Sequence, residues 1–240
     1  MRPILPAWTD TDAALHARLG EAIDPDRKVL GALERIQPIG GKRIADVGTG
    51  IGYYPMLLAR RTGRTYGVES DPELLAEARR RVAESHQPNI RIVEGEPTAL
   101  PLRDGAVDIV LSSQIDPEDS SRPAIVEAER VIRPGGRLIV IGHYGRDDVA
   151  ALLEPEVVEH ARAATQRKTG WWLRNGFKIK VVHARLDLRD RETALELLPR
   201  LYGDRGRAYL MGAHPPMLRL NLGLYHRVVG EAPESVTSSR

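Results

Sequence analysis

The sequence of 240 residues contains no cysteine. This absence excludes disulfide bonds, metal sites built on thiolates and a cysteine nucleophile. Long apolar runs are absent too, because no stretch approaches the roughly 18 residues that a membrane-spanning helix needs. The first residues, MRPILPAWTDTDAAL, lack the apolar segment of a secretory signal. We therefore expect a cytoplasmic protein with no membrane segment.

Lysine is scarce and occurs only at positions 28, 42, 168, 178 and 180, so arginine supplies most of the positive charge. The formal net charge is +2, but residues 162–207 hold twelve Lys and Arg against five Asp and Glu, whereas residues 1–161 hold twenty against twenty-six. We call residues 162–207 the basic third, and a segment of this charge can meet phosphates or an acidic substrate. Because its charges are interspersed with apolar positions, a solvated surface is favoured, and nucleic acid is not the expected partner.

Hydrophobic residues make up 42% of the chain and charged residues 28%, which is typical of globular proteins. Residues 11–36 predict two short helices that join near Asp24, with Pro25 at a helix start. Asp71 and Pro72 are expected to begin a further helix as its cap and first residue. Strands are expected at 42–48, 64–70, 90–96, 106–113, 137–145, 177–188 and 217–229, and helices at 53–63, 71–85, 122–132, 147–169 and 191–203.

Strands that alternate with helices at this spacing predict an α/β fold with a mostly parallel sheet and helices on both of its faces. We expect one domain over residues 1–230. Its N-terminal helical part covers residues 1–39, and residues 146–230 add helices and the last two strands. Residues 231–240 are polar and are expected to form a disordered tail.

Residues 44–52 read IADVGTGIG, a strand that leads into a glycine-rich turn. Dinucleotide pockets use G-x-G-x-x-G at this point. Gly48 and Gly50 fit that pattern, but Tyr53 occupies the third glycine position and the extra glycine is Gly52. The spacing therefore disfavours NAD.

Glu69 ends the second predicted strand, 21 positions after Gly48. A carboxylate at this offset suits both ribose hydroxyls of an adenosine compound and repels a 2′-phosphate, which disfavours NADP. The alternative is a turn that only needs glycine flexibility, with Glu69 as an exposed loop acid. Asp46, the three glycines and Glu69 together favour an adenosine-type ligand.

Four segments between about residues 40 and 145 are similar to a known family. They are IADVGTGIG, GVESDPELLAEAR, VEGEPTALPLRDGAVDIVLSS and AERVIRPGGRLIVIG, in this order. With them the chain resembles the class I S-adenosylmethionine-dependent methyltransferases, especially the small-molecule branch related to ubiquinone-type methyltransferases. The resemblance implies a Rossmann-like, doubly wound sheet of seven strands with an antiparallel C-terminal strand, and a cofactor-binding core at residues 40–145.

The resemblance also implies roles for individual residues. Asp46 and the loop backbone would hold the methionine moiety of the cofactor, and Glu69 would accept the ribose hydroxyls. The loop residues concerned are Gly48, Thr49, Gly50 and Gly52. Ser70 would lie against the adenine, and Ser112 and Ser113 would lie near the reactive methyl group.

The third segment departs from the family pattern of Gly-Asp-Ala, because this chain has Gly95, Glu96 and Pro97. The resemblance implies that the acid takes the adenine amino group and that the next backbone N–H reaches a ring nitrogen. Glu96 keeps a carboxylate for the first contact at longer reach. Pro97 has no N–H to donate. One adenine contact is therefore expected to be missing or replaced.

Substrates of open parallel sheets bind beyond the carboxyl ends of the strands. That edge offers Gln114 and Asp116 after one strand and His143 and Tyr144 after the next. His143 is the candidate base, because an imidazole exchanges protons near neutral pH. The alternative for His143 is a loop histidine that packs against neighbouring residues without a catalytic role. The alternative for Asp116 is a helix cap.

Aromatic residues give further candidates for the substrate pocket. Trp8, Tyr53 and Trp171 are the favoured ones, with Tyr54 and Trp172 as their neighbours. They can line a pocket or attract a methyl-accepting cation, but burial is an equally good interpretation of the tryptophan pair. The histidines show no metal-ligand spacing, so no metal is expected.

The favoured function is the in-line transfer of a methyl group from S-adenosylmethionine to a small molecule. Methyltransferases that act on base or glutamine amino groups usually carry Asn/Asp-Pro-Pro-Tyr/Phe where this chain has Ser113, Gln114, Ile115 and Asp116. One alternative is an RNA or protein methyltransferase that uses the basic third. The other is a non-catalytic member of the fold that binds the cofactor or a partner, because fold alone does not fix function.

Overall fold

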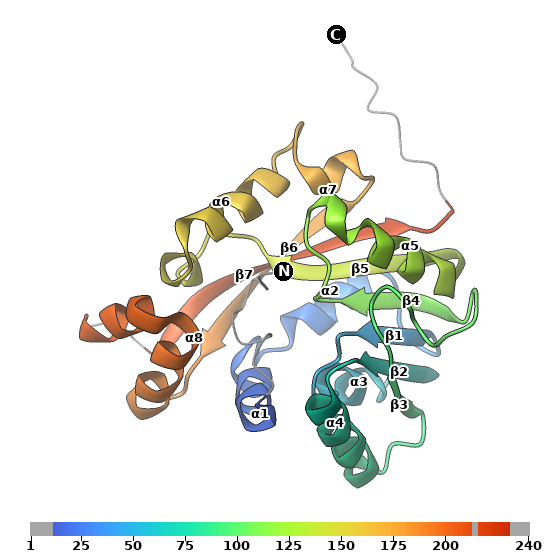
Figure 1. Ribbon diagram of the computed structural model, residues 1–240, viewed down its shortest axis with the longest axis horizontal. Coiled ribbons are helices and arrows are strands. Elements are labelled where there is room, and N and C mark those ends of the chain that lie inside the picture. The colour runs from blue at the N-terminus through green and yellow to red at the C-terminus, as the bar shows by residue number, and fades with distance from the viewer. Residues whose placement is uncertain (1–11, 213–215, 231–240) are drawn as a thin grey trace.

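Seven strands form one sheet in the order β3-β2-β1-β4-β5-β7-β6 in the computed structural model, which describes residues 12–212 and 216–230 (Figure 1). The strands are β1 (Arg43–Val47), β2 (Arg64–Glu69), β3 (Ile90–Glu94), β4 (Val107–Ser112), β5 (Ile132–His143), β6 (Lys178–Asp187) and β7 (Met217–Val228). Only β7 runs antiparallel to its neighbours β5 and β6. The predicted mostly parallel sheet with an antiparallel C-terminal strand is confirmed. Trp8 and the expected tail at 231–240 lie outside the described residues.

Helices cover both faces of this sheet (Figure 1). They are α1 (Ala13–Ala22), α2 (Lys28–Ile36), α3 (Tyr53–Leu58), α4 (Pro72–Ser85), α5 (Arg122–Val131), α6 (Pro155–Ala164), α7 (Trp171–Arg174) and α8 (Arg191–Met211), with short 3-10 turns η2 (Asp119–Ser121) and η3 (Val149–Leu152). Helices α1, α2 and α8 contribute to the core on one face, and α5 and α7 contribute to the core on the other.

Alternation along the strands divides the core in two. Ile44 of β1 packs with the α1, α2 and α8 core, whereas Ala45 packs with the α5 and α7 core. Successive side chains of a strand point to opposite faces, so one apolar run supplies both cores. Every residue of β4 is buried, as expected for a central parallel strand covered on both sides.

The order of the strands reverses at β1, which lies between β2 and β4. Connections leave in opposite directions at such a point and open a crevice at the carboxyl ends of the strands. The fold therefore places the end of β1 and the ends of β2 and β4 around one crevice. No helix in the described part of the chain is long and apolar enough to cross a membrane.

The prediction that Pro25 starts a helix is wrong. Helix α2 begins at Lys28, and the carboxylate of Asp24 accepts the backbone N–H groups of Lys28 at 2.9 Å and Val29 at 2.7 Å. Asp24 has a φ of 53° and is itself held by a backbone bond to Arg185 of β6. The cap thus depends on a contact distant in sequence, and Pro25 lies in the turn before the helix.

The prediction of a single helix at 147–169 is also wrong. The chain forms η3 and then α6, with a break at Leu153 and Glu154. Pro155 is the first residue of α6, and a residue before proline avoids the helical region, as the ψ of 140° at Glu154 shows. Helix α8 extends the expected 191–203 segment to Met211 but bends at Gly203, whose φ is 54°.

Replacing Asp24 with alanine is expected to lower the free energy of unfolding by about 2 kcal/mol, because two helix N–H groups lose their acceptor and alanine is strained at positive φ. Asp24→Asn is expected to lower the free energy of unfolding clearly less, since an amide oxygen still accepts a helix N–H and asparagine tolerates a positive φ. Urea denaturation measures both. Asp26→Ala, at an exposed neighbour, is the control. Equal losses for Asp24→Ala and Asp26→Ala would contradict the capping role.

Candidate functional site

The glycine loop after β1 has an unusual backbone. Gly48, Gly50 and Gly52 have φ values of 75°, 56° and 79°, which side chains rarely adopt. At Gly48 a Cβ atom would lie only 2.2 Å from the side chain of Gln114. At Gly52 a Cβ atom would meet Ala78 only at an ordinary contact distance of 3.5 Å, so its positive φ is what favours glycine there. The glycines therefore serve the loop conformation, and Gly48 also serves its close packing.

The carboxylate of Glu69 ties this loop to the end of β2. One oxygen accepts the N–H of Gly50 at 2.7 Å, and the other accepts those of Ser70 at 2.9 Å and Asp71 at 3.0 Å. Glu69 is buried, with 6% of its surface exposed. The alternative of an exposed loop acid is therefore wrong, and Glu69 has a structural task that sequence reasoning missed.

Asp46 is the second buried carboxylate of the loop. It accepts the hydroxyl of Thr49 at 2.7 Å. Burial raises the pKa of Asp46 to about 7, against the lowering effect of the Thr49 hydrogen bond, and the charge of Glu69 raises it further. A cation bound beside these two carboxylates would favour the ionised form of Asp46.

The first cavity opens at the carboxyl ends of β1, β2 and β4 and has a volume of about 280 Å³. It brings together eight of the predicted site residues: Asp46, Gly48, Thr49, Gly50, Tyr53, Glu69, Ser113 and Gln114. It also includes Tyr54, which the sequence offered as a neighbour of Tyr53, and residues that were not predicted for a site: His16, Leu19, Gly20, Ile23, Ile51, Asp71, Leu74, Leu111 and Ile141. Three of these residues, His16, Leu19 and Gly20, belong to α1. The sequence of that helix does not indicate which of its turns faces the loop.

Five other predicted cofactor residues do not line this cavity: Gly52, Ser70, Glu96, Pro97 and Ser112. Ser112 is fully buried, donates its hydroxyl to the carbonyl of Val47 at 3.1 Å and accepts the N–H of Gln114. Ser70 is exposed. Glu96 and Pro97 lie in a turn that the N–H of Ala99 closes onto the carbonyl of Glu96, and the Glu96 side chain is exposed.

A second cavity of about 350 Å³ lies at the neighbouring ends of β4 and β5. Its lining includes the predicted residues His143 and Asp116, together with Pro117, Glu118, Glu156, Val157, His160, Ala161, Trp172 and Tyr225. Ile141 of the first cavity and His143 of the second are two positions apart on β5, roughly 7 Å along the strand. The two cavities therefore share one edge of the sheet.

Two predicted pocket residues lie elsewhere. Trp171 is buried and donates its indole N–H to Asp119 at 3.2 Å, while its neighbour Trp172 lines the second cavity. Tyr144 lines neither cavity and lies under the guanidinium of Arg146, 5.5 Å from the ring centre. A sequence of two adjacent tryptophans could not show which ring faces the cavity.

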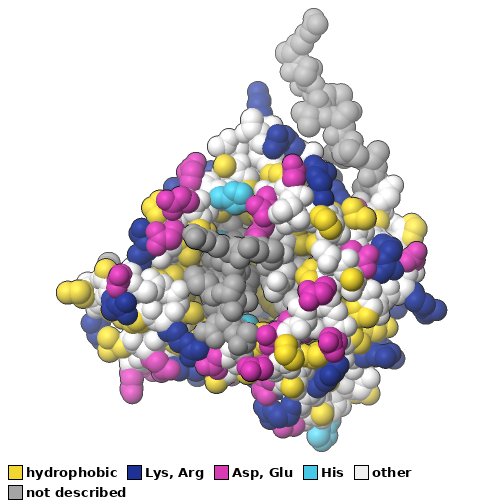
Figure 2. Space-filling view, in the orientation of Figure 1, with side chains coloured by type: hydrophobic (Ala, Val, Ile, Leu, Met, Phe, Trp, Pro, Cys, Tyr) yellow, Lys and Arg dark blue, Asp and Glu magenta, His cyan; other side chains and the backbone are white. Residues whose placement is uncertain are grey.

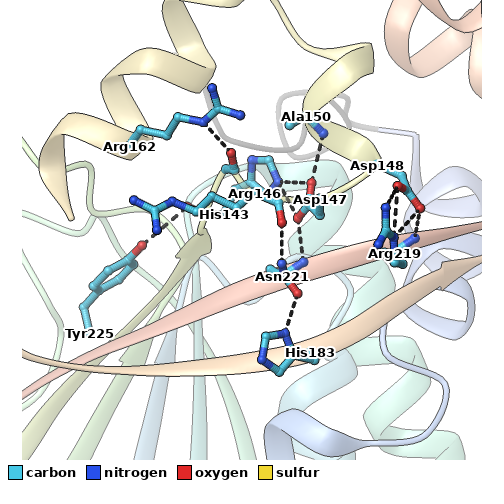
Figure 3. A network of polar contacts seen from close by, with 11 residues as sticks. His143, Arg146, Asp147, Asp148, Ala150, Arg162, His183, Arg219, Asn221 and Tyr225 are labelled. Atoms are coloured by element: carbon cyan, nitrogen blue, oxygen red, sulfur yellow. Dashed lines mark hydrogen bonds and ion pairs between the residues drawn. The ribbon is translucent and has the colours of Figure 1, made fainter. Parts of the chain in front are cut away.

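His143 forms a buried pair with Asp147 (Figure 3). Its Nε2 lies 2.9 Å from both carboxylate oxygens, and the two side chains are 1% and 0% exposed. Asp147 also accepts the N–H of Ala150 at 2.9 Å and that of Asn221 at 2.5 Å. A carboxylate so placed accepts the proton of Nε2, which leaves Nδ1 as an acceptor. Within the described residues this Nδ1 is buried and has no hydrogen-bond partner.

The first cavity suits a cation better than a phosphate. The carboxylates of Asp46, Glu69 and Asp71 line it, and no Lys or Arg does so within the described residues. Most N–H groups of the loop are already used, because Gly48 and Thr49 donate to Val68 and Gly50 donates to Glu69. A pyrophosphate needs such donors, whereas the sulfonium and ammonium groups of S-adenosylmethionine need acceptors. The residues present therefore fit this cofactor. No cluster of metal ligands occurs in the described part of the chain.

Comparison with known proteins agrees with this chemistry. A family model described as "Methyltransferase domain" matches residues 45–140. A protein-L-isoaspartate O-methyltransferase from Anaeromyxobacter dehalogenans is 30% identical over 158 residues, which cover 62% of this chain and 70% of the relative. A demethylmenaquinone methyltransferase from Thermus thermophilus is 37% identical over 103 residues, which cover 42% of this chain and 46% of the relative.

Solved structures with a similar fold are known as well. A crystal structure of a SAM-dependent methyltransferase from Aquifex aeolicus aligns with a TM-score of 0.56 at 18% identity, over 87% of this chain and 92% of that one. At this identity the likeness concerns the fold. Among several curated relatives, the chain spans only 27% to 63% of the relative's own length.

The raised pKa of Asp46 predicts a dependence of stability on pH. The folded protein holds the Asp46 proton up to about pH 7, whereas the unfolded chain loses it near the ordinary pKa of 3.8. Because the folded state binds more protons in this window, the free energy of unfolding falls as pH rises from about 4 to 7. The shift of about three pKa units sets an upper bound of about 4 kcal/mol on this loss.

Asp46→Asn keeps an acceptor for Thr49 but cannot titrate, so it isolates this effect. Urea denaturation from pH 4 to pH 8 is expected to show wild-type protein losing stability relative to Asp46→Asn as pH rises. Parallel curves for the two proteins would contradict the assignment.

Proposed function

The chain belongs to the class I S-adenosylmethionine-dependent methyltransferases, and we propose that it transfers a methyl group to a small-molecule acceptor. The cofactor is S-adenosylmethionine. One observation carries the proposal: two cavities share the carboxyl edge of the sheet, one built by the glycine loop and the other lined by His143. We further propose that residues 1–230 act as one domain, in the cytoplasm.

The first cavity would hold the cofactor. S-adenosylmethionine supplies a methyl group activated by its bond to sulfur, so the protein's contribution is alignment and exclusion of water. Asp46 and the loop carbonyls would accept the ammonium group. Three of the roughly four acceptor positions of the Glu69 carboxylate are already used by N–H groups, which leaves about one for the ribose hydroxyls. Glu69 thus orders the loop as well as binding the ligand.

The second cavity would hold the acceptor, with His143 as the base. Nδ1 of His143 accepts the proton of the acceptor, and the carboxylate of Asp147 stabilises the resulting imidazolium. Asp147 is kept in place by the N–H groups of Ala150 and Asn221. The cavity volume of about 350 Å³ lies within the range of small-molecule sites, roughly 300–1,000 Å³.

A protein acceptor is the second candidate, because one relative is a protein-L-isoaspartate O-methyltransferase. Two features argue against it. The small second cavity leaves little room for a peptide, and the carboxylates of Asp116, Glu118 and Glu156 that line it would repel an isoaspartyl carboxylate. A small uncharged or cationic acceptor fits this lining better.

The basic third does not favour a nucleic-acid acceptor. Five of its nine arginines pair with acids: Arg185 with Asp26, Arg189 with Glu21, Arg200 with Asp12, Arg205 with Glu154 and Arg207 with Asp204. On the face in Figure 2, Lys and Arg side chains alternate with acidic ones. Phosphate recognition would require these pairs to separate.

Replacing Glu69 with alanine is expected to weaken the binding of S-adenosylhomocysteine, the cofactor product, about 10- to 100-fold. The change removes a charged acceptor of the ligand and also the anchor of the loop. Isothermal calorimetry measures the affinity. Glu73→Gln, at an exposed position of α4, is the control for loss of charge. Near-normal affinity of Glu69→Ala would rule out this site for the cofactor.

Replacing His143 with alanine is expected to lower turnover about 10²- to 10⁴-fold while the affinity for S-adenosylhomocysteine stays unchanged. Transfer of radiolabelled methyl groups to a panel of small amines, phenols and alcohols first identifies a usable acceptor. His86→Asn, at the exposed end of α4 outside both cavities, is the control. Full activity of His143→Ala would exclude His143 as the base. A wild-type protein that binds the cofactor but methylates nothing would favour the non-catalytic alternative.

A further inference from the structure

The second cavity has a strongly acidic lining. Asp116 and Glu118 follow β4, and Glu156 faces them from α6. Within the described residues, no Lys or Arg lines this cavity. The other ionisable lining groups among residues 12–212 and 216–230 are His143, His160 and Tyr225. An electrostatic field of one sign in a confined space concentrates ligands of the opposite charge.

Asp116 is the carboxylate best placed to act on a bound group. It is half-buried, and burial raises the pKa of Asp116, as does the nearby charge of Glu118, while His160 lowers it. No hydrogen bond to its carboxylate occurs among the described residues, although its backbone N–H donates to Ser121 at 3.2 Å. Partial burial is unfavourable for an ionised carboxylate that accepts no hydrogen bond. A cationic ligand in the cavity would relieve this cost.

Aromatic rings form another part of the wall. Trp172 and Tyr225 stack at 4.2 Å between ring centres with an 8° angle between planes, and both line the cavity. Phe177 packs edge-on against Trp172 at 5.0 Å, so the indole is held in place. Aromatic surface attracts alkylammonium groups more than neutral groups of the same shape.

The imidazole of His143 supplies an independent sign of a ligand. The side chain is almost completely buried and faces this cavity, and its Nδ1 lacks a partner within the described residues. A buried nitrogen acceptor left unpaired costs free energy, which a ligand N–H would recover. The ligand group that fits must therefore donate a hydrogen bond here while its positive charge meets the carboxylates.

We propose that the second cavity binds a methyl acceptor that carries a protonated amine. This inference rests on the proposed function and names its substrate class. The ammonium group lies among Asp116, Glu118 and Glu156, and Trp172 contacts its alkyl groups. One N–H proton passes to Nδ1 of His143. This transfer leaves the lone pair on nitrogen as the nucleophile and the positive charge on the imidazolium beside Asp147.

A pair of isosteric probes tests the charge preference without turnover. N,N-dimethylethanolamine, which is protonated near neutral pH and carries one N–H, and its neutral carbon analogue, 3-methylbutan-1-ol, are titrated into the full chain near neutral pH at constant ionic strength, and binding is followed by calorimetry. The amine is expected to bind at least about tenfold more tightly than the alcohol, the ratio that one favourable charge contact gives. The indole N–H resonance of Trp172, assigned with Trp172→Phe, is expected to shift on addition of the amine. Equal binding of both probes, or binding of the amine without that shift, would overturn the proposal.

Variants locate the effect and separate it from cofactor binding. Asp116→Asn is expected to weaken the binding of N,N-dimethylethanolamine about tenfold and to leave the binding of the alcohol unaffected, whereas Glu73→Gln is expected to change neither. Unchanged binding of the amine in both Asp116→Asn and Glu118→Gln would overturn the proposal. The affinity for S-adenosylhomocysteine is measured on the same samples. If this product binds but the amine does not, the amine inference fails and the proposed function stands; if the product does not bind, the proposed function itself fails.

Discussion

The buried carboxylate of Glu69 is the contact on which the site depends. It joins the end of β2 to the glycine loop after β1 through Gly50, and to the start of α4 through Ser70 and Asp71. Each glycine of that loop adopts a conformation that other residues avoid, so the loop needs an external anchor to stay in one shape. Because Glu69 and Asp46 are both buried acids, the anchor also makes the crevice acceptor-rich, which suits a cationic cofactor and not a pyrophosphate.

The antiparallel strand β7 gives the second cavity its chemistry. It supplies the N–H of Asn221 that holds Asp147, and the ring of Tyr225 that stacks on Trp172. In the proposed arrangement, the parallel half of the sheet would build the cofactor crevice, and the C-terminal addition would build the acceptor side. His143 ends β5, the strand that joins the two halves. A proton acceptor at this junction would lie beside both proposed ligands, as methyl transfer to a protonated group requires.

The sequence predicted what local rules determine. Asp71 and Pro72 begin α4 as expected, because cap and first residue are adjacent in the chain. The cap of α2 escaped prediction, since Asp24 is fixed by Arg185 of β6. The loop acids were found from their spacing, whereas the partnership of His143 with Asp147 and the choice of Trp172 over Trp171 depend on β7 and α6. Tertiary contacts between distant segments leave no periodic signal in the sequence.

The most direct test of the two-cavity arrangement is a crystal structure of the protein with S-adenosylhomocysteine and N,N-dimethylethanolamine. The expected result is density for the cofactor product in the glycine-loop crevice, with its ribose at Glu69, and density for the amine between Asp116 and Trp172. Cofactor product bound away from Glu69, or both ligands competing for the same crevice, would contradict the assignment of the two cavities to cofactor and acceptor.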